Sequence, residues 1–194
     1  MKQNVVLRSQ RVGIFVDVQN LYHSSKNLYK SRVNYRELVR YLTAGRELIR
    51  AIAYVVKSEG IEGVASHEAP ASTRLERVES LASSGRGEAA FFEALEKSGL
   101  ELRAKDLQIY PDGVKKADWD VGMAVDAIRM ASALDVVVLV TGDGDFLPLV
   151  EYLKWGVGSY VEVAAFHRTA SSRLREAADR FVNIEEIPRI LIKK

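Results

Sequence analysis

An unbroken apolar run, Val136 to Val140, leads through Thr-Gly-Asp-Gly-Asp-Phe into two carboxylates, Asp143 and Asp145. A run of valine and leucine without a polar break predicts a strand buried on both faces of a parallel sheet. The same design occurs near the N-terminus, where the run Val12 to Val16 ends in Asp17. Two predicted strands therefore carry acid to their carboxyl ends, and ligands of open parallel sheets bind at this edge.

Apolar runs and helical patterns alternate along the rest of the chain, which is typical of a parallel sheet covered on both faces by helices. Further strands are predicted at Ile49–Val56, Leu100–Ala104, Tyr160–Ala165 and Phe181–Ile184. Helices are predicted at Tyr35–Leu42, at Glu88–Lys97 with Gly99 as its stop, at Phe146–Trp155, and from Ser171 or Ser172 through Ala178. The sequence thus predicts a three-layer α/β fold with a mainly parallel sheet of five or six strands.

A stripe of residues spaced at i, i+3, i+4, i+7 and i+11 indicates one more amphipathic helix, beginning near Asp118. Its members are Val121, Ala124, Val125, Ile128 and Ser132.

The 194 residues suit a single domain, and no internal repeat is visible. From about Lys57 to Gly87 the strand and helix pattern fails, because this stretch contains four glycines and a proline among polar residues. We interpret it as an insertion or a flexible loop.

Composition narrows the class of protein. The net charge of +2 leaves any contact with nucleic acid to a local patch. The chain has no cysteine, and its three histidines lack the spacing of zinc ligands. It also lacks a run of about 18 apolar residues that would span a bilayer, so we expect a cytoplasmic protein without a membrane partner.

Four carboxylates are the candidate metal ligands: Asp17, Asp120, Asp143 and Asp145. Each has a structural alternative, since carboxylates in turns and in the first turn of a helix are favoured without any function. Asp120 falls in such a first turn, Asp145 is placed to cap the helix at Phe146, and Asp17 is placed for an Asx-turn. Asn20 is likewise suited to cap the helix that follows it.

Caps and turns do not explain why the carboxylates would be gathered together. The ends of strands one and four become neighbours at the switch point of a doubly wound sheet. Carboxylates about 4 Å apart repel by about 4 kcal/mol per pair at an effective dielectric of about 20. A divalent cation offsets that repulsion, and oxygen ligands favour Mg²⁺ or Mn²⁺. The residues alone therefore favour metal-assisted phosphoryl transfer.

Three blocks of sequence, in their order and spacing, resemble the NYN domain of the PIN-like superfamily, in its LabA-like branch. They are Ile14–Leu21, Lys116–Asp126 and Thr141–Phe146, and the resemblance covers about Arg11 to Ile184. It implies that residues 1–194 form a single NYN domain of PIN-like, Rossmannoid fold, with five strands ordered 3-2-1-4-5. It also implies metal-dependent ribonuclease chemistry.

The resemblance implies a role for each candidate. Asp17 is similar to a direct metal ligand, with Asn20 close by to orient water or phosphate. Asp120 is similar to the acid that opens the helix before strand four, and Asp143 to the acid that ends that strand. Asp145 would complete the Mg²⁺ or Mn²⁺ pocket, and catalysis would fall to Asp17, Asn20, Asp120 and Asp143.

Two other acids of the same blocks are weaker candidates. Asp118 is placed to cap its helix. Asp126 lies six residues after Asp120, about 240° around the helix, so it cannot share that face and is interpreted as a supporting or structural residue.

Single-stranded RNA is the expected substrate, with Lys116 and Arg168 as phosphate contacts beside the edge motifs. Solvated surface is the simpler explanation for the other cations near these segments, which are Lys26, Lys30, Lys115 and His167. Tyr22 and Trp119 are suited to stack on unpaired bases, although core packing explains Trp119 equally well.

Two other functions remain open. One is a non-catalytic NYN module that regulates through RNA or protein contacts. The other is a different Mg²⁺ phosphotransfer enzyme, which is disfavoured because Val18 and Gln19 follow Asp17 where an aspartyl phosphatase has Asp-x-Asp, and because no P-loop is present. The sequence also leaves open a homodimer through the later helices.

Overall fold

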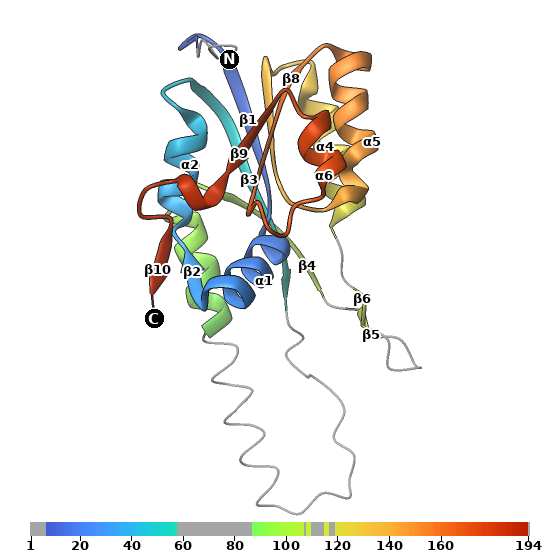
Figure 1. Ribbon diagram of the computed structural model, residues 1–194. Helices are drawn as coiled ribbons and strands as arrows, with labels where there is room; N and C mark the ends of the chain where they lie inside the picture. Colours follow the sequence, from blue (N-terminus) through green and yellow to red (C-terminus); the bar gives the residue numbers. More distant parts are fainter. Residues whose placement is uncertain (1–6, 58–86, 107, 110–114, 117–118, 194) are drawn as a thin grey trace, which may run out of the picture.

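The computed structural model describes residues 7–57, 87–106, 108–109, 115–116 and 119–193 (Figure 1). The stretch predicted as an insertion, about 57–87, lies almost wholly outside these residues, and its role stays a prediction. Asp118 also lies outside them. Within the described part, no helix is both long enough and apolar enough to cross a bilayer.

The centre of the fold is a six-stranded sheet in which each pair of neighbouring strands is parallel. Its order is β4-β3-β1-β7-β8-β9, which confirms the predicted order and adds one strand at the end. β1 and β7, the two strands that end in acid, are neighbours in register from Val12 opposite Val136 to Val16 opposite Val140. The strands are β1 (Arg11–Asp17), β3 (Glu47–Lys57), β4 (Glu101–Asp106), β7 (Val136–Val140), β8 (Tyr160–Ala165) and β9 (Arg180–Asn183).

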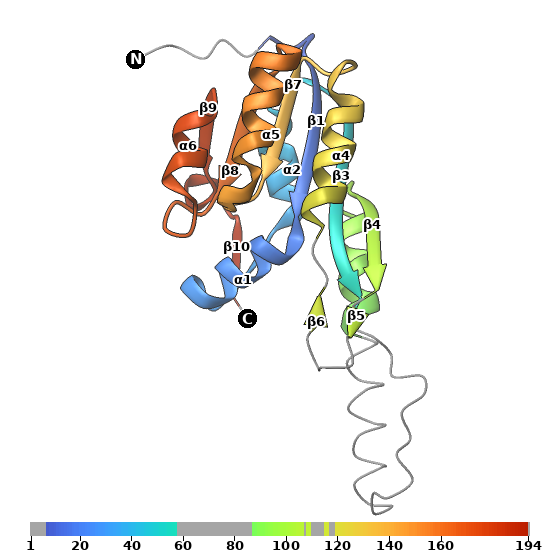
Figure 2. The ribbon, with the colours of Figure 1, turned by 90° about the vertical axis from the view of Figure 1, so that its right-hand side faces the viewer.

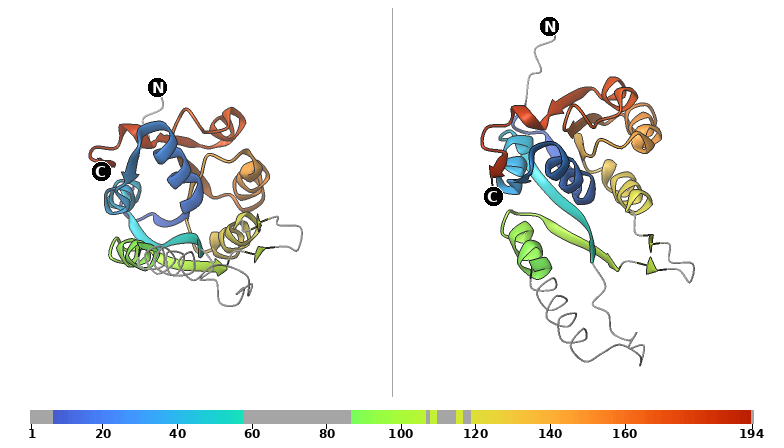
Figure 3. Two further views of the ribbon diagram at one scale, coloured as in Figure 1. Left: turned by 90° about the horizontal axis from the view of Figure 1, so that it is seen from below. Right: turned by 60° about the horizontal axis from the view of Figure 1, so that its bottom comes forward.

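Helices cover both faces of this sheet and make the predicted three layers (Figure 3). On one face lie α1 (Val18–Tyr29), α2 (Tyr35–Thr43) and the helical residues 87–96, which end before Gly99 with its positive φ of 88°. On the other face lie α4 (Asp120–Ala131), α5 (Leu147–Glu151) and α6 (Ser172–Ala177).

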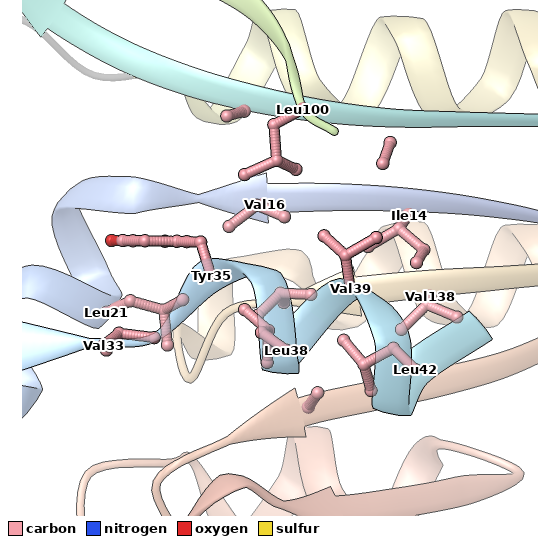
Figure 4. Close-up of a cluster of buried hydrophobic side chains, with 14 of the residues drawn as sticks. Ile14, Val16, Leu21, Val33, Tyr35, Leu38, Val39, Leu42, Leu100 and Val138 are labelled. Carbon is pink, nitrogen blue, oxygen red and sulfur yellow. The ribbon is translucent and has the colours of Figure 1, made fainter. Parts of the chain in front are cut away.

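A hydrophobic core lies on each face of the sheet. Alternate residues of each strand belong to one core or the other, because successive side chains of a strand point to opposite faces. Ile14 and Val16 of β1 pack with α2 on the first face, where Leu38 and Leu42 are also fully buried (Figure 4). Phe15 points to the opposite face and packs with α4 and α5. The long apolar strands therefore hold both helical layers in place.

Short elements complete the chain. The turn after β7 forms the 3-10 helix η1 (Gly144–Phe146), and α5 continues into the π-helical segment η2 (Tyr152–Val157), where the sequence predicted one continuous helix. A second 3-10 helix, η3 (Ile184–Glu186), follows β9. Two antiparallel pairs were not predicted: β2 (Ser31–Val33) with β10 (Leu191–Lys193), and β5 (Gln108–Ile109) with β6 (Lys115–Lys116).

The orientation of α4 departs from the pattern that predicted it. The helix forms, but its buried side chains are Met123, Ala127 and Ala131. The stripe that signalled it is exposed at its three largest members, which are Val121, Val125 and Ile128. Small and flexible side chains thus make the contact with the sheet, and branched side chains face outward.

Candidate functional site

Asp17 is the last residue of β1 and the N-cap of α1, which begins at the lower end of the strand in Figure 2. Its Oδ1 accepts a hydrogen bond from the backbone N–H of Asn20 at 3.0 Å. The prediction that Asn20 caps this helix is therefore wrong, because α1 begins at Val18 and Asp17 provides the cap. The half-buried Asp17 carboxylate is thus held rigidly at the carboxyl edge of the sheet, meaning the edge where the parallel strands end.

A fully buried hydroxyl joins the ends of β1 and β7. Thr141 Oγ1 donates to Asp17 Oδ2 at 3.2 Å and accepts from the backbone N–H of Asp143, also at 3.2 Å. Sequence reasoning did not single out Thr141, although a polar residue directly after a buried apolar run is a usable signal. Its two hydrogen bonds fix the Asp17 carboxylate relative to the chain that carries Asp143.

Asn20 makes a second link between the two strand ends. Its Oδ1 accepts from the backbone N–H of Gly142 at 3.0 Å. This contact also determines which way the amide points, because only the oxygen can accept. The NH₂ group of Asn20 is therefore the end of the amide that does not bond Gly142.

Asp143 caps the turn after β7. Its Oδ1 accepts from the backbone N–H of Asp145 at 3.0 Å, and the 3-10 helix η1 starts at the next residue, Gly144. The alternative in which Asp145 caps the helix at Phe146 is therefore wrong, because the cap is Asp143. The side chain of Asp145 is exposed to solvent.

Asp17 and Asp143 interact electrostatically. Burial raises the pKa of Asp17 above its ordinary value, and the negative charge of Asp143 raises it further. The hydrogen bonds from Asn20 and Thr141 act in the opposite direction and lower the pKa. The net rise means that the fold penalises the ionised form of Asp17, and a nearby cation would relieve that penalty.

The loop after β8 packs against Gly142, in the turn that follows β7. The backbone N–H of Ser171 donates to Gly142 O at 2.9 Å. A Cβ on Gly142 would lie 3.1 Å from Ala170 Cα and 3.2 Å from Thr169 O, so this close approach favours glycine. Thr169 Oγ1 also bonds Ser24 Oγ of α1 at 3.0 Å. The loop that carries the exposed Arg168 is thus fixed beside the acidic strand ends.

Asp120 is the first residue of α4 and is half-buried. Its helix packs against η1, so it lies on the same side of the sheet as the turn that carries Asp143. Among the described residues, however, no three Asp, Glu or His side chains come close enough together to hold one metal ion. The structure thus pairs Asp17 with Asp143, and the four-carboxylate metal site stays a prediction.

Asp126 and Trp119 make structural contacts. Tyr54 Oη donates to Asp126 Oδ2 at 3.0 Å, and Arg103 Nε lies 3.7 Å from the same oxygen. Trp119 Nε1 donates to Val55 O at 2.8 Å, and its ring centroid lies 5.4 Å from that of Tyr54. Of the two interpretations of Trp119, these contacts favour core packing over base stacking.

The predicted nucleic-acid contacts are only partly described. The backbone of Lys116 belongs to β6, and its side chain lies outside the described part. Arg168 and His167 are exposed, and so are Lys26 and Tyr22 of α1, where the Lys26 ammonium lies 5.3 Å from the centre of the Tyr22 ring.

Comparisons with known proteins agree with this arrangement. A protein from Synechococcus elongatus, the low amplitude and bright protein LabA, is 27% identical over 103 residues, which span 50% of this chain and 55% of LabA. The crystal structure of a protein of unknown function from Vibrio parahaemolyticus superposes with a TM-score of 0.76 at 30% identity, covering 99% of this chain and 100% of that one. Residues 11–185 match the family model of the NYN domain. The chain therefore belongs to the NYN domain family, in its LabA-like branch.

Proposed function

We propose that this protein is a Mg²⁺- or Mn²⁺-dependent ribonuclease that hydrolyses phosphodiester bonds at the carboxyl edge of the sheet. The observation that carries the proposal is the juxtaposition of Asp17 and Asp143: burial raises the pKa of Asp17, and the charge of Asp143 adds to that rise. Two carboxylates held together by the caps of separate elements gain nothing structurally from their mutual repulsion. A bound cation gives that arrangement a function.

Two carboxylates are enough to hold Mg²⁺, although the set of protein ligands is small. Mg²⁺ keeps several of its waters and is commonly held by one or two carboxylates, so a third protein ligand is not required. Asp17 and Asp143 would hold the ion, with Asp120 and Asp145 contributing through water. Such an ion lowers the pKa of a bound water and stabilises negative charge on phosphate oxygens.

The other residues position the substrate. The NH₂ group of Asn20, whose oxygen is occupied by the bond from Gly142, would donate to the attacking water or to a phosphate oxygen. Water attacks phosphorus in line, a new O–P bond forms, and the P–O3′ bond breaks. The attacking water gives up a proton to solvent and the leaving 3′ oxygen takes one up, so the products carry a 5′-phosphate and a 3′-hydroxyl. Thr141 holds Asp17 in place throughout.

Single-stranded RNA is the proposed substrate. Arg168 lies in the loop fixed against Gly142, within the same edge as the carboxylates, and Lys116 precedes Asp120 by four residues. Cations at these positions compensate the phosphate charge on either side of the scissile bond. Tyr22 is exposed on α1 and can stack on an unpaired base.

The direct test is cleavage of a labelled single-stranded RNA with Mn²⁺, with Mg²⁺ and with EDTA. Wild-type protein should cleave only with metal, and Asp143→Asn should not cleave. Asp106→Asn is the matched control, because it removes an exposed carboxylate at the end of the edge strand β4 and should leave cleavage intact. Full activity of Asp143→Asn would refute the proposal.

A second candidate is a NYN module that binds RNA or protein without cleaving. It is favoured by one observation, that no three possible ligands gather around one point in the described part of the chain. Binding of RNA with no product at any Mn²⁺ concentration would identify this function.

A further inference from the structure

The outer side of α4 is apolar and exposed. Val121 is 74% exposed, Val125 45% and Ile128 41%, and these three residues follow each other along one side of the helix. Water-exposed valine and isoleucine add nothing to the stability of a monomer, and a contiguous apolar surface commonly marks an interaction site.

The neighbouring helical segment extends this surface. α5 and η2 lie beside α4 on the same face of the sheet (Figure 2), and α4 contacts η2. Here Tyr152 is 49% exposed, Trp155 84% and Val157 37%. We call these six residues the α4–α5 face: Val121, Val125, Ile128, Tyr152, Trp155 and Val157. Tryptophan and tyrosine are the side chains that most often anchor protein interfaces.

Two exposed charges of opposite sign lie among these residues, Arg129 on α4 and Glu151 on α5. Neither has an ion pair or a hydrogen bond from its side chain to another described residue. A polyanion such as RNA would meet exposed charges of both signs and an apolar surface here, so nucleic acid fits poorly. A surface of the same composition fits well, because each charge finds its opposite.

We propose that the α4–α5 face is the interface of a homodimer, with a two-fold axis that lays α4 of one protomer against α5 of the other. A two-fold axis brings the same patch of both protomers together, so each Arg129 pairs with the partner's Glu151. The apolar residues of both copies are buried between these pairs. The proposal is independent of the nuclease activity, since it involves none of the carboxylates at the strand ends.

The oligomeric state in solution tests the proposal. Light scattering coupled to gel filtration, at about 1 to 100 µM protein, should give twice the chain mass for the wild type. Val125→Glu places a charge in the middle of the face and should give a monomer with an unchanged circular dichroism spectrum. Ile192→Glu is the control, because Ile192 is 49% exposed, close to the 45% of Val125, and lies on β10 outside the face; this variant should remain a dimer. A monomeric wild type throughout, or a dimeric Val125→Glu, would overturn the proposal.

A charge reversal tests the arrangement without disturbing the apolar surface. Arg129→Glu and Glu151→Arg should each weaken the dimer about tenfold, because each places like charges opposite one another. The double variant restores opposite charges and should dimerise nearly as well as the wild type. A double variant no stronger than the single ones would rule out the pairing of Arg129 with Glu151.

Discussion

The side-chain oxygen of Asn20 accepts a hydrogen bond from the backbone N–H of Gly142 at 3.0 Å, although the two residues are 122 positions apart. The bond joins the end of β1 to the end of β7, beside the contact of Thr141 with Asp17. Acidic residues from two distant segments are thereby held at one edge. The same bond occupies the oxygen of the Asn20 amide and leaves its NH₂ group as the donor in the proposed mechanism.

Two substitutions separate the structural role of Asn20 from its catalytic role. Asn20→Ala removes the acceptor for Gly142 and should lower the free energy of unfolding by about 1 to 3 kcal/mol, the cost of an unsatisfied buried donor. Asn20→Asp keeps an acceptor but adds a carboxylate to the edge that holds Asp17 and Asp143, so it should be more stable than Asn20→Ala only at low pH, where the carboxylates are protonated. It loses the NH₂ donor, however, and cleavage by both variants should fall about 100-fold. Urea denaturation and initial cleavage rates measure the two effects, and an active Asn20→Asp would show that the donor is dispensable.

Asp17→Asn should make the metal-free protein more stable at neutral pH. The pKa of Asp17 is raised in the fold, so its contribution to stability is fully present below its ordinary pKa and is lost as pH rises through the raised value. Asparagine cannot ionise and caps a helix about as well as aspartate. The advantage of Asp17→Asn should therefore appear above about pH 4 and vanish below it.

Urea denaturation in EDTA across this pH range measures the difference. Asp17→Ala is the control, because it removes the charge and also the cap, which is worth about 1 kcal/mol. It should be less stable than Asp17→Asn at every pH. If Asp17→Asn is no more stable than the wild type at pH 7, ionisation of Asp17 carries no cost in the fold.

Divalent cations should stabilise the wild-type fold. An ion that binds only the folded state, present at a concentration a hundred times its dissociation constant, raises the free energy of unfolding by about 2.7 kcal/mol. A thermal melt detects a change of this size. The shift should be lost in Asp143→Asn, because one carboxylate of the pair is neutral, and kept in Asp106→Asn. This measurement does not depend on catalysis, so it identifies a metal site even in a protein that cleaves nothing. Equal shifts in both variants would place the ion elsewhere.

The central sheet is predictable because its strands carry a strong local signal. The runs Val12 to Val16 and Val136 to Val140 are too apolar for any exposed position, and their order follows from the resemblance to the family. The pairing of β2 with β10 was missed because both strands are three residues long and meet only through tertiary contacts.

The orientation of α4 could not be predicted from the sequence, for a different reason. Its sequence contains two apolar sides, one with valine and isoleucine and one with methionine and alanine. Periodicity identifies the helix but cannot decide which side packs on the sheet, because that depends on tertiary packing against this face, where Phe15 and Leu139 are buried. For the acidic edge, the sequence predicted that Asp17, Asn20 and Asp143 lie at one edge of the sheet, and it missed the hydroxyl of Thr141 that connects them. Their catalytic roles stay a prediction.

A buried ion pair away from the acidic edge should be a strong determinant of stability. Arg46 and Glu162 are 6% and 2% exposed, and two hydrogen bonds of 2.9 and 3.2 Å join them. Glu162→Gln leaves the guanidinium of Arg46 buried without its counter-charge, which should cost about 3 to 5 kcal/mol in urea denaturation. Glu101→Gln is the control, since its pair with Arg50 has the same 2.9 Å distance but is half exposed. It should cost far less. Equal losses in the two variants would show that burial adds nothing to the pair.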